Sequence, residues 1–363
     1  MQLDLNLAEN SLGHITSAVQ FGFIIGTLVF AFLTLADRFS PSKVFFVSAM
    51  AGSLSNLGVF LWAHDFESLI FLRFITGFFL AGIYPVGMKI ASDWYEKGLG
   101  KALGYLVGAL VVGTAFPHLL KNLTETLPWK YVIILTSICA SLGGILILIF
   151  VPNGPFRKKS KSPDFTVFFK VFQEKNFRSA AFGYFGHMWE LYTLWAFIPF
   201  ILSYYLKLHS EISFNMPFLS FLIIAVGGIA CVIGGYLSQK FGSDKIAFYS
   251  LLASGICCLL SPLLFQLPYF LFLVFLFFWG MVVISDSPQF STLVAQTAPK
   301  ESIGTALTIV NCIGFSITII SIQLINLLIE KIPAQFIFVI LGLGPAFGLF
   351  ALSNILNWKM TNR

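Results

Sequence analysis

The stretch LTLADRFSPSK, Leu33–Lys43, decides the fold of this chain. It is a short polar turn between two long apolar runs, and it carries Asp37, Arg38 and Lys43. A second copy, GYLSQKFGSDK, occupies Gly235–Lys245 and begins 202 positions later. A repeat of this kind is the first feature to look for in a sequence, because it fixes how the rest of the chain is divided.

Two further correspondences follow the repeated turn at nearly the same offset. Pro85 corresponds to Pro288, and the tripeptide KAL that begins at Lys101 corresponds to the TAL that begins at Thr305. Three correspondences in the same order indicate that the chain consists of two related halves.

The composition is that of a membrane protein. Of the 363 residues, 57% are hydrophobic and only 10% are charged, whereas soluble domains carry about 25% charged residues. The net charge of +6 comes from basic residues between the apolar runs. That placement is typical of membrane topology signals, so nucleic acid is not an expected partner. The five cysteines lie in apolar runs with no His or carboxylate at ligand spacing, so we expect no metal and no cofactor.

Eleven apolar runs are long enough to cross a bilayer, which takes about 20 residues per helix. The predicted fold class is therefore an all-α membrane protein. The expected spans cover residues 12–36, 44–63, 67–92, 99–120, 129–151, 178–206, 214–238, 246–266, 268–296, 303–329 and 333–357.

The loop charges predict the orientation of the spans. If the loops alternate sides, sixteen of the 22 Lys and Arg residues fall on the side of the turn at 37–43. Four fall on the other side and two lie inside spans. The positive-inside rule makes the basic side cytoplasmic. Met1 is then outside and Arg363 inside, and residues 152–177 form a basic cytoplasmic linker between an N-terminal half, 1–151, and a C-terminal half, 178–363.

The two polar turns resemble the G-x-L-x-D-R-x-G-R-K turn that follows the second helix in each half of major facilitator superfamily transporters. Leu33 and Ser40 replace the two glycines of the first copy, and Gln239 replaces the Asp of the second. The resemblance implies a two-half helical bundle of twelve helices with both termini in the cytoplasm. The first span here matches the family's second helix, so the N-terminal half has five spans and lacks the first. We expect the missing segment to lie upstream of Met1.

The resemblance also implies a gating role for the turns, which in the family latch the halves together on the cytoplasmic side. It assigns this role to Asp37, Arg38 and Lys43 in the first copy, and to Lys240 and Lys245 in the second. Opposite charges at a helix end can pair with a neighbouring helix terminus and separate when the halves move. The alternative is a charged turn that only fixes topology.

Charged residues inside spans are costly and usually face a cavity. Arg73, Glu190 and Asp286 are the strongest candidates. In the resemblance they fall on the fourth, seventh and tenth helices, which line the family's translocation cavity. At 100° per residue, Tyr84 lies on the face of Arg73. Lys89 is on another face and is expected to pair locally with Asp93, four residues later.

Two more polar residues accompany these charges. His187 lies one helical turn from Glu190, and Gln289 shares the face of Asp286. Each candidate has an alternative interpretation. Arg73 could cap structure near the outer surface, Glu190 and His187 could satisfy each other, and Asp286 could bind backbone freed by Pro288.

The stretches GFFLAGIYPVGMKIA and DSPQFSTLVAQTAP resemble bacterial carriers grouped with the nitrate/nitrite and cyanate porters. The nitrate branch uses an interior arginine in the second helix of each half, and spans 12–36 and 214–238 have none. Nitrate is therefore disfavoured. The prediction is a monomeric secondary transporter of the bacterial inner membrane that moves a small anionic solute together with H⁺.

Two alternative functions remain open. The chain could be a membrane sensor that binds solute without moving it, or an inactive transporter shortened at its N-terminus. An enzyme is not expected, because the sequence has no nucleophile–base pair, metal-spaced cluster or phosphate-binding glycine loop.

Overall fold

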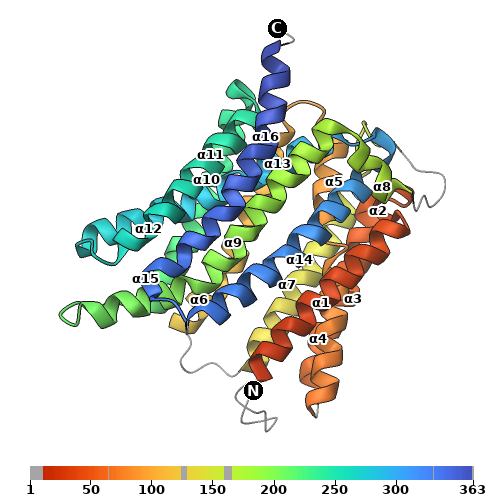
Figure 1. Cartoon of the computed structure of the whole chain (residues 1–363). Helices are drawn as coiled ribbons and strands as arrows, with labels where there is room; N and C mark the ends of the chain where they lie inside the picture. Colours follow the sequence, from red (N-terminus) through yellow and green to blue (C-terminus); the bar gives the residue numbers. More distant parts are fainter. Residues whose placement is uncertain (1–10, 64, 124–128, 159–165, 330, 362–363) are drawn as a thin grey trace. The chain divides into compact units, whose positions relative to one another are not determined.

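A computed structural model describes the chain except for residues 1–10, 64, 124–128, 159–165, 330 and 362–363 (Figure 1). The described residues form helices and connecting turns, with no strand among them. Met1 and Arg363, which the loop charges place on opposite sides of the membrane, lie outside the described residues. The helices are α1 Ser11–Phe32, α2 Leu35–Arg38, α3 Pro41–Leu61, α4 Phe66–Leu80, α5 Tyr84–Trp94, α6 Leu99–Leu123, α7 Trp129–Phe150, α8 Val167–Lys170, α9 Lys175–Leu208, α10 Met216–Phe241, α11 Ser243–Leu264, α12 Tyr269–Ser285, α13 Ser287–Thr297, α14 Ile303–Ile329, α15 Ala334–Ile337 and α16 Leu343–Thr361, with short 3₁₀ turns η1 Val171–Gln173, η2 Lys300–Ser302 and η3 Phe338–Gly342.

The described residues contain ten helical segments that are long and apolar enough to cross a membrane, and α1 adds a shorter apolar stretch, Ser17–Phe32. The prediction of an all-α membrane protein is confirmed. Each of the eleven predicted spans coincides with one of these segments. The length of each apolar run was enough to predict these helices. In lipid a spanning segment must satisfy its backbone hydrogen bonds internally, so an apolar run of sufficient length is expected to be helical.

Several of these helices begin at residues that favour a helix N-terminus. Asp65 caps α4 by accepting a hydrogen bond from the backbone N–H of Ser68, and the Ser68 side chain completes a capping box. Asn215 caps α10 by accepting from the N–H of Phe218. Pro41 begins α3, where its missing N–H costs nothing.

Two predicted spans are interrupted in the middle. The span predicted at 67–92 is divided into α4 and α5 by a turn at Ala81–Ile83, just before Pro85. The span predicted at 268–296 is divided into α12 and α13 at Asp286, just before Pro288. Proline lacks the N–H that an uninterrupted helix needs at that position. The two breaks therefore repeat at matching positions in the two sequence halves.

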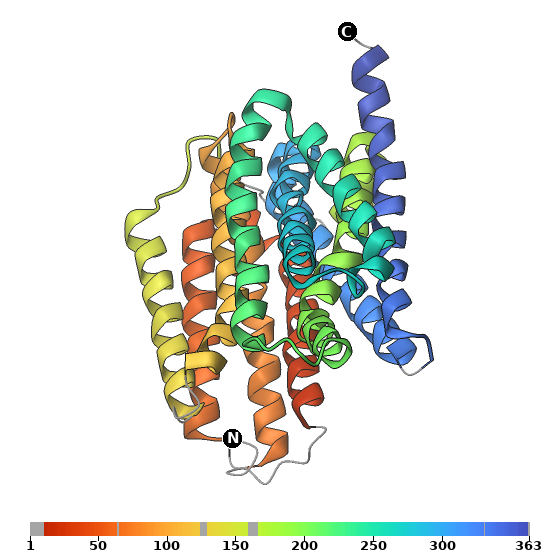
Figure 2. The same ribbon diagram turned by 90° about the vertical axis from the view of Figure 1, so that its left-hand side faces the viewer.

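One compact unit, unit 1, consists of residues 1–96, 126–171 and 298–315. In it α1 packs against α4, and α3 packs against both α4 and α7; Figure 2 shows α7, in yellow, alongside α3. The α1–α4 contact is close because glycines face backbone: a Cβ on Gly22 would lie 2.1 Å from the carbonyl oxygen of Phe74, and one on Gly77 would lie 2.0 Å from that of Val19. Small residues at such crossings let two membrane helices approach.

The other compact unit, unit 2, consists of residues 97–125, 172–297 and 316–363. Its most extensive helix contact joins α6 to α10, where a Cβ on Gly104 would lie 2.7 Å from the carbonyl oxygen of Cys231. The units do not coincide with the sequence halves, because α6 belongs to unit 2 and the first part of α14 belongs to unit 1. The division at 1–151, 152–177 and 178–363 stays a prediction that rests on the repeat.

Candidate functional site

Asp37, the acid of the repeated turn, is buried on the short helix α2. One carboxylate oxygen accepts a hydrogen bond from the N–H of Gly304 at 3.0 Å. The other accepts from the N–H of Thr305 at 2.7 Å and from its hydroxyl at 2.7 Å. These donors are at the first turn of α14, where N–H groups have no partner within the helix and the dipole favours an anion. The prediction that this acid pairs with a helix terminus is thereby given a specific partner within unit 1.

Lys89 lies beside Asp37 and is completely buried. Its ammonium is 3.7 Å from the Asp37 carboxylate and forms an ion pair with Asp93. The predicted local pair with Asp93 is therefore confirmed, while the contact with Asp37 was missed because Lys89 is 52 positions away in sequence (89 minus 37). Burial raises the pKa of Asp37, and Lys89 together with the donors of Thr305 and Gly304 opposes that increase.

The other charges of the two turns make different contacts. The Arg38 guanidinium lies over the Phe39 ring at 5.4 Å and within 3.5 Å of the Leu33 carbonyl oxygen. Lys43 is exposed at the wall of a cavity. In unit 2, Lys240 is exposed over the Phe241 ring at 5.3 Å, and Lys245 is exposed in the first turn of α11. Among the five predicted gating residues, the structure places Asp37 alone against a helix terminus of its unit.

Val151, the last residue of the predicted N-terminal half, and the first residues of the predicted linker bind the repeated turn Leu33–Lys43, which we call the gating turn. The Arg157 guanidinium donates to the carbonyl oxygen of Phe39 at 2.6 Å. Ser40 donates to the Asn153 side chain at 2.8 Å, and Ser42 to the carbonyl oxygen of Val151 at 2.6 Å. We call residues 151–157 the strap. These contacts could not be predicted from the sequence, because bonds between distant polar side chains and backbone groups follow no periodic pattern.

His187 and Asp286 meet in unit 2. Nδ1 of His187, on α9, is 2.9 Å from the Asp286 carboxylate at the α12–α13 break, and both side chains are buried. The main-chain carbonyl of Asp286 accepts from the N–H groups of Gln289 and Phe290 at 2.9 Å each. The Gln289 side chain is fully buried, and neither of its amide atoms has a hydrogen-bond partner among the described residues.

Glu190 lies one turn from His187 on α9 and is also buried. One of its carboxylate oxygens accepts hydrogen bonds from the Ser254 hydroxyl and, at 2.7 Å, from the Trp279 indole N–H. Glu190 and His187 thus each have their own partner on another helix, which differs from the alternative in which they satisfy each other. Sequence periodicity put them on one face of α9 but could not identify partners on α11, α12 and the α12–α13 break.

The remaining two candidates belong to unit 1. Arg73 is half-buried on α4, and its Nε has no hydrogen-bond partner among the described residues. Tyr84 is the first residue of α5, after the turn that ends α4. The other four candidates, His187, Glu190, Asp286 and Gln289, belong to unit 2.

The arrangement defines a class of protein: a helical, multi-pass membrane protein with ionisable groups buried inside its spans. The sequence profile of the Major Facilitator Superfamily matches residues 1–322. The chain belongs to the major facilitator superfamily of transporters.

Three curated relatives illustrate the breadth of the matches. A Lactococcus lactis multi-drug resistance efflux pump PmrA homolog is 26% identical over 74% of this chain and 66% of its own length. A probable nitrate/nitrite antiporter of Thermus thermophilus, NarK1, is 25% identical over 61% of this chain and 53% of its own. The D-galactonate transporter of Escherichia coli is 27% identical over 41% of this chain and 33% of its own. The matches thus span two thirds of these relatives or less, and they show the superfamily rather than the nitrate branch.

Two solved structures share the fold. The human organic anion transporter MFSD10 has a TM-score of 0.75 at 16% identity, covering 93% of this chain and 82% of its own. The proton:xylose symporter XylE has a TM-score of 0.74 at 16% identity, covering 98% of this chain and 87% of its own.

Proposed function

We propose that this protein is a secondary active transporter that moves a small anionic solute together with protons, by alternating access between two helical halves. The observation that carries the proposal is the buried set of His187, Asp286 and Glu190. All three lie within helical segments long enough to cross a membrane. Ionisable groups at such depth are costly and typically mark an ion or substrate pathway.

The proton-carrying role is assigned to the carboxylates of this set. Glu190 accepts hydrogen bonds from the neutral side chains of Ser254 and Trp279 on one oxygen, and the Cys258 thiol also donates to its carboxylate. These donors carry no charge, so Glu190 can take up a proton without leaving a cation unpaired among them. His187 can share a proton with Asp286 across their 2.9 Å contact. Glu190 and the His187–Asp286 pair could therefore pass a proton along the pathway as access alternates between the two sides of the membrane.

The anionic solute is supported by Arg73 and by the relatives. Arg73 is a cation within a span, and its Nε has no partner among the described residues, so it could bind a carboxylate or an oxyanion. Relatives include transporters named for D-galactonate and, as probable functions, for nitrate/nitrite and galactarate/D-glucarate. The breadth of these names supports an anion class but no single member of it.

The cytoplasmic gate is assigned to Asp37. When its carboxylate binds the first turn of α14 the cytoplasmic side is closed, and release of those three hydrogen bonds accompanies opening. We further propose that the protein works as a monomer in a bacterial inner membrane, with the linker and the C-terminus in the cytoplasm.

The proposal is tested in proteoliposomes with an imposed pH gradient and a panel of small organic and inorganic anions. The wild-type protein is expected to move protons with at least one anion, and Glu190→Gln is expected to abolish proton movement. Glu211→Gln is the matched control, because Glu211 is 71% exposed beyond the end of α9, and it should behave like the wild type.

Each departure from this pattern has a specific meaning. Proton movement by Glu190→Gln equal to the wild type would contradict the assigned proton site. Uptake of every anion unchanged in Arg73→Ala would contradict anion binding at Arg73. Solute binding without movement in any variant would favour a membrane sensor.

A further inference from the structure

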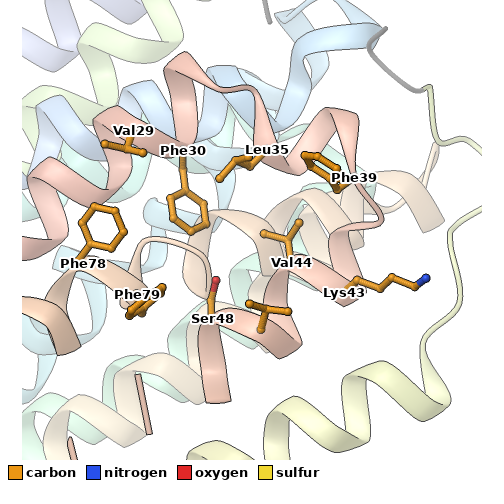
Figure 3. A pocket seen from close by; sticks show the side chains of 10 residues that line it. Val29, Phe30, Leu35, Phe39, Lys43, Val44, Ser48, Phe78 and Phe79 are labelled. Carbon is orange, nitrogen blue, oxygen red and sulfur yellow. The ribbon is translucent and has the colours of Figure 1, made fainter. Parts of the chain in front are cut away.

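Unit 1 contains a cavity of about 390 Å³ beside the gating turn (Figure 3). Its walls come from α1, the α2 segment, α3 and α4. The lining residues are Val29, Phe30, Leu35, Phe39, Lys43, Val44, Val47, Ser48, Phe78 and Phe79.

The lining is apolar along its length and charged at one end. Lys43 and Ser48 are the two polar side chains in it, and Ser48 is 2% exposed. Figure 3 shows Lys43 at one end of the cavity, with Phe78 and Phe79 at the other. Val47 is 59% exposed and Phe39 51%, so the cavity is open at the surface of the structure.

A lining of this kind excludes the transported solute as the occupant. A small anion would lose its hydration and gain few hydrogen-bond donors among eight apolar side chains. An apolar chain attached to an anionic group fits both ends of the cavity. Its volume is also within the range of about 300–1,000 Å³ that is common for small-molecule pockets.

We propose that this cavity binds one acyl chain of an anionic phospholipid, with the lipid phosphate at Lys43. The cavity opens beside α3, a helix that is long and apolar enough to cross the membrane, so bilayer lipid can reach it from the side. Lys43 directly precedes the apolar part of that helix, where a lysine can extend its ammonium to the headgroup level. Basic pockets between membrane helices bind anionic headgroups in this way.

The bound chain would pack against both sides of the gate. Leu35 is two residues before Asp37 and Phe39 is two residues after it, and both line the cavity. An acyl chain in the cavity therefore holds α2 in the position that binds the first turn of α14. Anionic lipid would thereby stabilise the closed cytoplasmic gate that we assign to Asp37, a consequence that rests on the proposed function.

Native mass spectrometry of the full chain tests the proposal directly, without measuring transport. The purified protein is titrated with phosphatidylglycerol and with phosphatidylcholine that carry the same acyl chains. We expect one phosphatidylglycerol to bind more tightly than phosphatidylcholine, and Lys43→Gln to remove the preference. The expected ratio is about five-fold, as for one lysine near an anionic surface.

Two matched controls locate the site. Lys245→Gln changes the exposed lysine at the corresponding position of the second turn and should keep the preference. Val47→Trp narrows the open side and should weaken phosphatidylglycerol binding, whereas Val112→Trp, at an exposed valine on α6, should not.

Three outcomes would overturn the proposal. Equal affinity of the wild type for the two lipids would mean a neutral lipid or another apolar ligand. If Lys43→Gln binds phosphatidylglycerol as tightly as the wild type does, Lys43 does not contact the lipid headgroup. Unchanged binding in Val47→Trp would place the lipid elsewhere.

Discussion

At the scale of a single residue, the buried Asp37 carboxylate connects α2 to the first turn of α14 and to Lys89 on α5. It receives three hydrogen bonds from the first turn of α14 and lies 3.7 Å from the Lys89 ammonium. Its charge is thus balanced by two elements at once. Changes at Asp37 should therefore affect stability as well as transport.

Asp37→Asn keeps the shape of the side chain but removes its charge and turns one acceptor into a donor that faces backbone N–H groups. We expect the free energy of unfolding to fall by about 1–3 kcal/mol, the cost of leaving a buried polar group unsatisfied. Thermal unfolding in detergent measures this loss of stability. Thr305→Val removes one of the three donors and should cost less than Asp37→Asn; the reverse order would contradict the geometry.

Lys89 neutralises two acids, Asp37 and Asp93, within unit 1. Lys89→Met should lower the free energy of unfolding by about 3–5 kcal/mol, because the substitution leaves two buried carboxylates without their cation. The double variant Lys89→Met/Asp93→Asn should recover part of the loss, and a double-mutant cycle on unfolding temperatures measures the recovery. A double variant no more stable than Lys89→Met would contradict charge as the cause.

At the scale of elements, the contact between α1 and α4 depends on glycine. Gly77→Ala would place a methyl group against the Val19 carbonyl, and we expect a loss of about 1–3 kcal/mol from overpacking. Gly113→Ala on α6 is the control, because no heavy atom lies within 4 Å of its added Cβ. That variant should be neutral or slightly more stable, since alanine favours helix. Equal thermal stability of the two variants would contradict the close helix approach.

The helices could be predicted from the sequence because each apolar run is its own signal. The breaks at Ala81–Ile83 and at Asp286 were not predicted, although Pro85 and Pro288 follow them two residues later at matching repeat positions. A single proline does not say whether a membrane helix bends or is interrupted, because neighbouring helices decide which backbone groups are satisfied.

The candidate site was predictable only in part. Charges inside spans pointed to Glu190 and Asp286, since such charges are rare and costly. Their partners were not predictable: Ser254 and Trp279 come from other helices, and nothing in their local sequence marks them. Pairing of distant side chains depends on helix packing, which periodicity does not encode.

At the scale of the whole molecule, the loop charges predict which ends of the helices face the cytoplasm. A cysteine at position 158, through Lys158→Cys, should react with a membrane-impermeant maleimide only after the cells are permeabilised. Glu211→Cys should react in intact cells. Both positions are exposed, with side chains 53% and 71% accessible, so burial would not mask the result. A background without the five native cysteines is needed, and the opposite labelling pattern would contradict the positive-inside orientation.

The strap has a practical consequence for work with split chains. Residues 151–157 bind the turn through Ser40, Ser42 and the Phe39 carbonyl, so the turn and the strap belong on one polypeptide. Two co-expressed fragments divided after Lys158 keep these bonds within the first fragment. Fragments divided before Val151 must form them between separate chains, and the two division points, only eight residues apart, are not interchangeable.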